Sequence, residues 1–230
     1  MRRMCACGNI FLERTLVSRL KGLFSVAGKT ALITGGGSGI GGFMAQSLSE
    51  EGGTVLLVGR REDKLREVLG VRDGKIFVID LCEAGASERL FTMVSDCGYQ
   101  PDIIVNAAGI NPRVHADKID EEMWTYTVHL NLNVPFLVAQ KFVPRMKANG
   151  WGRIINIASM QSNRAFPNGI SYGSAKGGVT QLTRAMAEAW SAHGITANAI
   201  APGFFPTELT APLFEDPKTA ADLASRTAIG

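Results

Sequence analysis

The sequence predicts an α/β protein built on one parallel sheet with helices on both faces. Six short runs rich in valine and isoleucine alternate with amphipathic stretches, and the chain has 26 glycines among 230 residues without any periodic repeat. Strands that alternate with helices imply βαβ units with right-handed crossovers. A chain of this length buries roughly 70% of its unfolded surface, so it needs neither disulfides nor a metal to fold.

Each expected strand is a short apolar run, and each expected helix has apolar residues at helical spacing. In chain order, the expected strands are residues 30–34, 54–59, 75–80, 102–107, 153–158 and 196–201. The expected helices include residues 39–51, 63–69, 122–149 and 172–193. No repeat, low-complexity segment or linker interrupts this order. We therefore expect one domain, residues 26–230, after an N-terminal extension, residues 1–25.

The net charge of +3 is unevenly distributed. Residues 1–30 carry six basic side chains against one acidic side chain, which leaves about −2 on the remaining chain. A nucleic-acid-binding protein presents a clustered basic face, and the body of this chain has none. No apolar run approaches the roughly 18 residues that a membrane span requires. Nucleic-acid and membrane partners are therefore not expected.

The first 24 residues have a pattern of their own. Residues 10–24 place apolar side chains near helical spacing with basic residues between them, as in a mitochondrial targeting segment. A helix that packs on this domain or on a neighbouring subunit gives the same pattern. Four cysteines without zinc spacing, and histidines without nearby ligands, predict reduced thiols and no metal. We expect a cytoplasmic protein, with mitochondrial targeting as the alternative.

A glycine-rich turn joins the first strand to the first helix. Residues 34–41 read TGGGSGIG. A strand that turns at once into a helix needs glycine where φ is positive and where the backbone approaches a ligand. The free N–H groups and the positive dipole at the helix N-terminus suit a diphosphate. This position in the chain predicts a dinucleotide-binding site.

The end of the second strand indicates which dinucleotide binds. A carboxylate at this position would recognise the 2′-hydroxyl of NAD, whereas an arginine suits the 2′-phosphate of NADP. The chain has Arg60 and Arg61 here and no acidic residue before Glu62. NADP is therefore the expected cofactor. NAD stays possible, because Arg60 can instead stack on adenine and because Ser38 stands where a second basic residue would strengthen the preference.

A tyrosine and a lysine lie four residues apart on an expected helix. Tyr172 and Lys176 therefore share one helix face. A free tyrosine titrates near pH 10. A neighbouring ammonium and an oxidised nicotinamide would favour the phenolate and lower that pKa. Ser159, thirteen residues before Tyr172 at a strand end, completes a group suited to proton exchange with an alcohol or ketone.

Taken in order, these motifs resemble the short-chain dehydrogenase/reductase family. The glycine-rich turn, the segment Asn106-Ala107-Ala108-Gly109, the Ser159, Tyr172 and Lys176 spacing and the Pro202-Gly203 turn before Thr207 cover residues 28–210. The resemblance implies a Rossmann-type doubly wound sheet. It also implies hydride transfer between a secondary alcohol or ketone and the nicotinamide, with Ser159 orienting the substrate, Tyr172 exchanging the proton and Lys176 holding the ribose.

The resemblance further implies a set of binding residues. Those implied for the dinucleotide are Gly35, Ser38, Gly39, Ile40, Gly41, Asp80, Leu81, Asn106, Gly109, Tyr172, Lys176, Pro202, Gly203 and Thr207. Asn131 matches the family asparagine that supports a water-linked proton route to the lysine. Asn156 is interpreted as structural.

The loops around residues 110–117, 160–170 and 202–217 resemble gluconate 5-dehydrogenase-type members of the family. A sugar acid or polyol is therefore the expected substrate, and Arg113, Gln161 and Arg164 are candidates to meet a carboxylate. A 3-oxoacyl-thioester reductase shares the same motifs and is the alternative.

Family members usually continue beyond the position of Gly230 with a seventh strand, so we expect a sheet without its last strand. A weakly active dinucleotide-binding protein is therefore a second alternative. A homo-oligomer is also expected. The sequence favours a dimer through the helices around Asn131 and over residues 172–193, with an apolar surface made by Leu132, Phe136, Val138, Leu182 and Met186.

Overall fold

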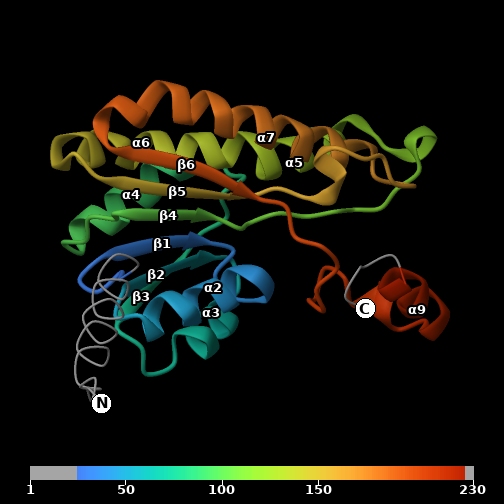
Figure 1. Cartoon of the computed structure of the whole chain (residues 1–230), viewed down its shortest axis with the longest axis horizontal. Helices are drawn as coiled ribbons and strands as arrows, with labels where there is room; N and C mark the ends of the chain where they lie inside the picture. The colour runs from blue at the N-terminus through green and yellow to red at the C-terminus, as the bar shows by residue number, and fades with distance from the viewer. Residues whose placement is uncertain (1–24, 226–230) are drawn as a thin grey trace, which may run out of the picture.

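The computed structural model describes residues 25–225, whose six parallel strands lie in the order β3-β2-β1-β4-β5-β6 (Figure 1). The strands are β1 (Thr30–Thr34), β2 (Thr54–Gly59), β3 (Gly74–Val78), β4 (Ile103–Asn106), β5 (Gly152–Ile157) and β6 (Ile195–Ile200). Strands β2 and β3 are added on one side of β1, and β4, β5 and β6 on the other, so the strand order reverses between β1 and β4. In a parallel sheet this switch point opens a crevice at the carboxyl ends of the strands. The doubly wound fold predicted from the sequence is confirmed.

Helices cover both faces of the sheet. Helices α2 (Gly39–Glu50) and α3 (Glu62–Leu69) share one hydrophobic core with β1 and β2. Helices α4 (Ala86–Asp96), α6 (Val134–Asn149) and α7 (Ile170–Trp190) share the core on the opposite face. The remaining helices are α5 (Glu121–Val128), α8 (Ala211–Phe214) and α9 (Pro217–Ser225). Short turns of 3-10 helix are η1 (Ala116–Lys118), η3 (Met160–Ser162) and η4 (Ser191–His193).

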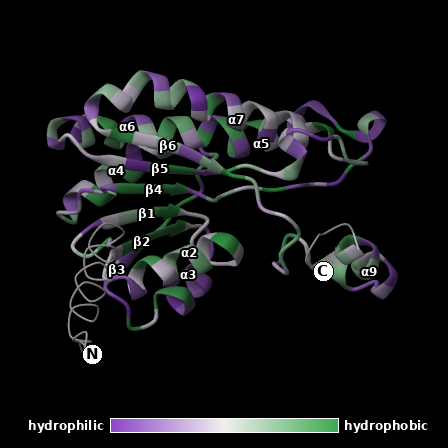
Figure 2. Ribbon diagram, viewed as in Figure 1, coloured by the Kyte–Doolittle hydropathy of each residue, from purple (hydrophilic) through white to green (hydrophobic). Residues whose placement is uncertain are grey.

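Successive side chains of a strand point to opposite faces of the sheet, so one strand contributes to both hydrophobic cores. In β1, Leu32 packs under α4, α6 and α7, whereas Ala31 and Ile33 pack under α2 and α3. All three side chains are buried, which explains why the strand is a continuous apolar run. Figure 2 shows β2 and β4 coloured hydrophobic, whereas α7 alternates between hydrophobic and hydrophilic residues.

The helix expected over residues 122–149 is in fact two helices. Helix α5 ends at Val128, one turn of π-helix, η2, spans His129–Asn133, and α6 begins at Val134. Such turns insert an extra residue and occur often at functional sites. Asn131 lies within η2. Helix α4, which the sequence analysis does not name, buries Ala86, Leu90 and Val94 along one face.

The expectation of an apolar helix-pair surface needs correction. Val138 and Met186 are 1% and 2% exposed and belong to the core between the sheet and α6 and α7. They cannot contribute to an interface. Leu132 packs against Gly178 of α7, where an added Cβ would lie 2.8 Å from its side chain.

Within residues 25–225 the sheet has six strands, and β6 pairs only with β5. In the same range no helix is long and apolar enough to cross a membrane, and no cluster of three or more His, Cys, Asp or Glu side chains could hold a metal ion. Cys82 and Cys97 are free thiols. The helix expected over residues 10–24, the other two cysteines and residues 226–230 lie outside the described residues.

Candidate active site

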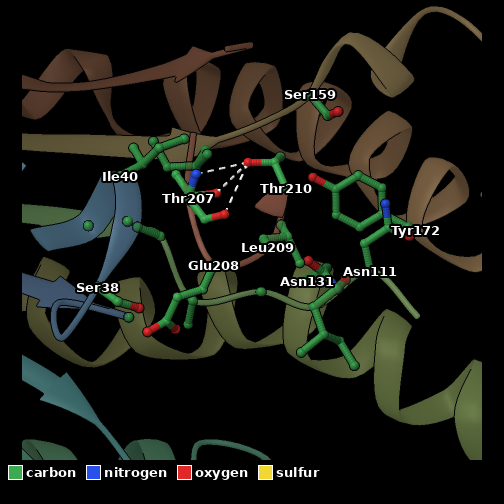
Figure 3. A pocket seen from close by; sticks show the side chains of 18 of the residues that line it. Ser38, Ile40, Asn111, Asn131, Ser159, Tyr172, Thr207, Glu208, Leu209 and Thr210 are labelled. Carbon is green, nitrogen blue, oxygen red and sulfur yellow. Dashed lines mark hydrogen bonds between the residues drawn. The ribbon is translucent and has the colours of Figure 1, made fainter. Parts of the chain in front are cut away.

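A cavity of about 790 Å³ opens at the carboxyl ends of the strands. The loops that follow all six strands contribute to its walls, as expected at the switch point of a doubly wound sheet (Figure 3). The expected site residues that line it are Gly35, Ser38, Gly39, Ile40, Gly41, Arg60, Asp80, Leu81, Gly109, Asn131, Ser159, Tyr172, Lys176, Pro202, Gly203 and Thr207. The structure therefore brings together segments that are far apart in the sequence, from Gly35 to Thr207.

Glycine is required where the first loop meets the fourth strand. Gly35 has a φ of +67°, and an added Cβ would lie 2.8 Å from the backbone N and Cα of Ala108. A Cβ on Gly41 would lie 2.4 Å from the carbonyl oxygen of Gly35. Both contacts are too short for any side chain. The two loops therefore pack backbone against backbone at the floor of the cavity.

The N-terminus of α2 is suited to an anion. Its N-cap, Ser38, makes no side-chain capping hydrogen bond, and the first turn has no acidic residue. Gly39, Ile40 and Gly41 of this first turn line the cavity. Their N–H groups and the positive end of the helix dipole fit the diphosphate of a dinucleotide.

The two arginines after β2 have different partners. Arg60 Nη1 donates to the Tyr126 hydroxyl at 3.1 Å and lies 3.5 Å from Asp80 Oδ2. Arg61 Nη2 donates to Ser38 Oγ at 3.1 Å and to Glu208 Oε2 at 2.6 Å. The sequence analysis assigned a binding role to Arg60 alone. Arg61 follows it in the same motif, so its position next to the glycine-rich turn could have been anticipated.

Asn106 does not line the cavity, contrary to the expectation. Its side chain is 3% exposed and donates to Asn156 Oδ1 at 2.8 Å and to the Pro135 carbonyl at 3.3 Å. Asn156 in turn donates to Thr183 Oγ1 at 2.9 Å. This buried network joins β4, β5, α6 and α7. Asn106 therefore supports the loop that contains Gly109 from behind, and Asn156 is structural, as interpreted from the sequence.

Tyr172 lies on the first turn of α7, and Ser159 lies near it in the same cavity (Figure 3). Burial raises the pKa of Tyr172, and Ser159 and the positive charge of Arg113 lower it. The sequence analysis expected Lys176 and an oxidised nicotinamide together to lower this pKa. Burial is the larger influence because Tyr172 is only 9% exposed.

Lys176 is fixed by the end of β5. Its Nζ donates to the Ile157 carbonyl at 2.6 Å and lies 5.6 Å from the centroid of the Tyr172 ring. The side chain is 4% exposed, and this burial lowers the pKa of Lys176 to about 8. Near neutral pH both its charged and its neutral forms are therefore accessible.

The Asn131 side chain extends from η2 towards Gly109 and Lys176. Its Nδ2 donates to the carbonyls of Ile110 and Thr127, both at 2.9 Å. Its Oδ1 is buried and has no protein partner. An added Cβ on Gly109 would lie 2.6 Å from this oxygen and 3.8 Å from Lys176 Nζ. The asparagine oxygen and the lysine nitrogen thus face one glycine.

Arg113 also lines the cavity, and its Nη2 donates to the Leu209 carbonyl at 3.1 Å. The φ of Arg113 is +54°, which is strained for a residue with a side chain, and such strain is concentrated at functional sites. Gln161 also lines the cavity, whereas Arg164 does not. Phe166 and Phe204 form an edge-to-face pair with centroids 6.2 Å apart.

Together the fold and these side chains define a dinucleotide-binding α/β domain with a serine, a tyrosine and a lysine at its switch point. The sequence profile of the family described as short chain dehydrogenase matches residues 29–218. The chain belongs to this family. It is an NAD(P)-dependent oxidoreductase that acts on CH–OH groups, and the family resemblance and enzyme class predicted from the motifs are confirmed.

Individual relatives share this similarity over most of the chain. The 2-dehydro-3-deoxy-D-gluconate 5-dehydrogenase of Bacillus subtilis is 36% identical over 90% of this chain and 83% of its own length. The gluconate 5-dehydrogenase of Gluconobacter oxydans is 35% identical over the same shares. The crystal structure of a gluconate 5-dehydrogenase from Burkholderia cenocepacia, in complex with NADP and tartrate, is similar with a TM-score of 0.84 at 35% identity. That match covers 90% of this chain and 84% of the other.

Proposed function

We propose that this chain interconverts a secondary alcohol and a ketone on a sugar acid or a related small hydroxy acid, with NADP(H) as the preferred cofactor. One observation carries the substrate class. Arg113 lines the cavity close enough to Tyr172 for its charge to lower the pKa of the phenol. A hydroxyl held at Tyr172 would therefore place a carboxylate of the same small molecule within reach of a guanidinium.

The proposed chemistry uses four residues of this chain. Ser159 hydrogen-bonds the substrate oxygen and orients it towards Tyr172. Tyr172 accepts the hydroxyl proton during oxidation and returns it during reduction. A protonated Lys176 favours the phenolate, and Asn131 holds the loop after β4 in place through the Ile110 carbonyl. The dinucleotide, when bound, supplies the hydride donor or acceptor.

The preference for NADP(H) is supported by the charges after β2. Arg60, Arg61 and Lys64 line the cavity there, together with Ser38 of the glycine-rich turn. None of the cavity-lining residues between the end of β2 and Leu65 is acidic. Guanidinium groups bind phosphate oxygens in pairs of charge-assisted hydrogen bonds. Several similar solved structures contain bound NADP.

The proposal is tested by following absorbance at 340 nm with a panel of substrates. The panel contains gluconate, 2-dehydro-3-deoxygluconate, glycerol and a 3-oxoacyl thioester, each with both cofactors in the appropriate redox state. We expect the highest kcat/KM with a sugar acid and NADP(H). A thioester with the highest kcat/KM would instead favour the reductase alternative, which the 31% identity to the 3-oxoacyl-[acyl-carrier-protein] reductase of Rickettsia felis supports. Cofactor binding without turnover of any substrate would indicate a binding protein.

Self-association as a homodimer belongs to the same proposal. Phe136 and Leu182 are partly buried against the core and leave apolar surface on α6 and α7. This surface is smaller than the sequence suggested, because Val138 and Met186 are internal. Light scattering at micromolar concentration should give the mass of a dimer. Replacement of Leu182 by Glu should shift it to a monomer, and a stable tetramer would contradict the proposal.

A further inference from the structure

The segment after β6 is tied to two arginines on the other side of the cavity. Residues 204–210 are called the strap below. Within it, Glu208 Oε2 accepts from Arg61 Nη2 at 2.6 Å, and the Leu209 carbonyl accepts from Arg113 Nη2 at 3.1 Å. The strap contains a hydrogen-bonded turn, in which Thr207 N donates to Thr210 Oγ1 at 2.9 Å and Thr210 N donates to the Thr207 carbonyl at 3.0 Å.

The Glu208 carboxylate lies among groups that suit a phosphate. It accepts a hydrogen bond from Arg61 Nη2, which also donates to Ser38 Oγ, and Figure 3 shows the carboxylate directed towards Ser38. The Arg61 guanidinium is the largest influence that lowers the pKa of Glu208, and Ser38 and Lys64 lower it further. A guanidinium, a hydroxyl and an ammonium at the start of the glycine-rich turn form an anion site. In this structure its anion is a side chain of the strap.

We propose that Glu208 is a built-in competitor for the 2′-phosphate of NADP(H) at Arg61 and Ser38, and that it sets how strongly the chain discriminates NADPH from NADH. The inference deepens the cofactor preference proposed above and rests on it. NADH has no 2′-phosphate, so it leaves the Arg61–Glu208 pair intact. NADPH must displace the carboxylate, and the displaced charge would still lie close to the phosphate.

The expected gain in NADPH affinity follows from the solvent exposure of the Arg61–Glu208 pair. Both side chains of the Arg61–Glu208 pair are 54% exposed, so water screens the pair, and breaking it costs at most about a five-fold factor in affinity. Repulsion between the carboxylate and a nearby phosphate adds to this cost. Removal of the Glu208 charge should therefore strengthen NADPH binding by about 5- to 10-fold.

The experiment measures dissociation constants by calorimetry with ligands that differ only in the 2′-phosphate. The ligand pairs are NADPH with NADH, and adenosine 2′,5′-bisphosphate with adenosine 5′-phosphate. The variants are Glu208→Gln, Arg61→Gln and the double variant. Glu62→Gln is the matched control, because Glu62 is an exposed acid beside Arg61 that pairs with Arg66 and does not line the cavity.

Glu208→Gln should strengthen both 2′-phosphorylated ligands by about 5- to 10-fold and change the other two by less than about two-fold. The gain from Arg61→Gln to the double variant should be smaller than the gain from the wild type to Glu208→Gln, because only the repulsion is then relieved, and Glu62→Gln should show no gain. An equal gain for NADH and NADPH, no gain, or the same gain in Glu62→Gln would overturn the inference. A wild type that prefers NADH contradicts the proposed cofactor preference, whereas a selective gain in Glu208→Gln still supports the competitor role.

Discussion

Lys176 Nζ lies 5.6 Å from the centroid of the Tyr172 ring and donates to the carbonyl of Ile157. Ser159, two residues beyond Ile157, lowers the pKa of Tyr172 from the same strand end. The end of β5 therefore positions both side chains of α7. Spacing on the helix places them on one face, and the strand end fixes where each functional group lies.

Replacement of Tyr172 by Phe should remove turnover and keep cofactor binding. The variant loses only a hydroxyl, and general acid–base catalysis typically contributes about 10²- to 10⁴-fold. We expect kcat to fall by a factor in that range, with the dissociation constant of NADPH changed by less than about two-fold. Steady-state kinetics and fluorescence titration measure the two quantities. Tyr99→Phe, which packs against the core outside the cavity, is the control; near wild-type turnover in Tyr172→Phe would refute the role.

Lys176 should make stability depend on pH in the alkaline range. Burial lowers its pKa from 10.5 to about 8, so between these values the unfolded chain binds more protons than the folded chain. The free energy of unfolding should therefore rise with pH in this window, relative to Lys176→Met, by at most about 3 kcal/mol. Below pH 8 the buried ammonium destabilises the wild type. Urea unfolding between about pH 7 and pH 10.5 tests this, and an unchanged difference between the two proteins would contradict it.

The control for that experiment is Lys75→Met, since Lys75 is an exposed residue of β3. Its difference from the wild type should not change across the same window. Lys176→Met should also weaken both cofactor binding and turnover, because the proposed role of the lysine includes the ribose as well as the phenol. If turnover were lost while cofactor binding stayed intact, Lys176 would act on the Tyr172 phenol and not on the ribose.

Arg60 should contribute to the choice of cofactor. The wild type is expected to bind NADPH more tightly than NADH, and Arg60→Ala to reduce this difference. Loss of a hydrogen bond to a charged group corresponds to about a 10- to 100-fold change in affinity for NADPH. Fluorescence titrations with both cofactors measure it. Arg66→Ala, on the exposed side of α3 and outside the cavity, should change neither affinity. Equal affinities in the wild type would contradict the prediction.

The sequence predicts the fold well because its strongest signals are local. Strands β1, β2 and β4 are nearly continuous apolar runs, and the boundaries expected for β1 and β2 agree with the structure. Glycines such as Gly35 occur where positive φ and close backbone contact require them. The short π-helical turn around Asn131 was missed, because a one-residue change of helical register leaves the apolar pattern almost unaltered.

Contacts between distant segments could not be predicted in the same way. Arg61 and Glu208 are 147 residues apart, and nothing in the local pattern of either residue indicates their ion pair. Asn106 lies within a cofactor motif, yet its side chain is directed into the core because Asn156 on the neighbouring strand offers it a partner. The direction in which the pKa of Tyr172 shifts depends on burial, which spacing along a helix does not reveal.

Arg113 should determine the response to a carboxylate substrate. Arg113→Gln removes the positive charge beside Tyr172, so the KM for a sugar acid should rise by about 10- to 100-fold. A neutral polyol has no carboxylate for Arg113 to bind, so its KM should change little. Because the Arg113 charge lowers the pKa of Tyr172, the variant should also show its alkaline rise in oxidation rate at a higher pH than the wild type.

Arg164→Gln is the matched control for this prediction. Arg164 is an exposed arginine on the loop that contains Phe166, but its side chain does not line the cavity. It should leave the KM for the sugar acid and the pH profile unchanged. If Arg113→Gln raised the KM of the acid and of the polyol equally, its effect would come from the Leu209 carbonyl that it holds, through displacement of the strap. The arginine would then be a positioning residue, and the proposed substrate class would lose its main support.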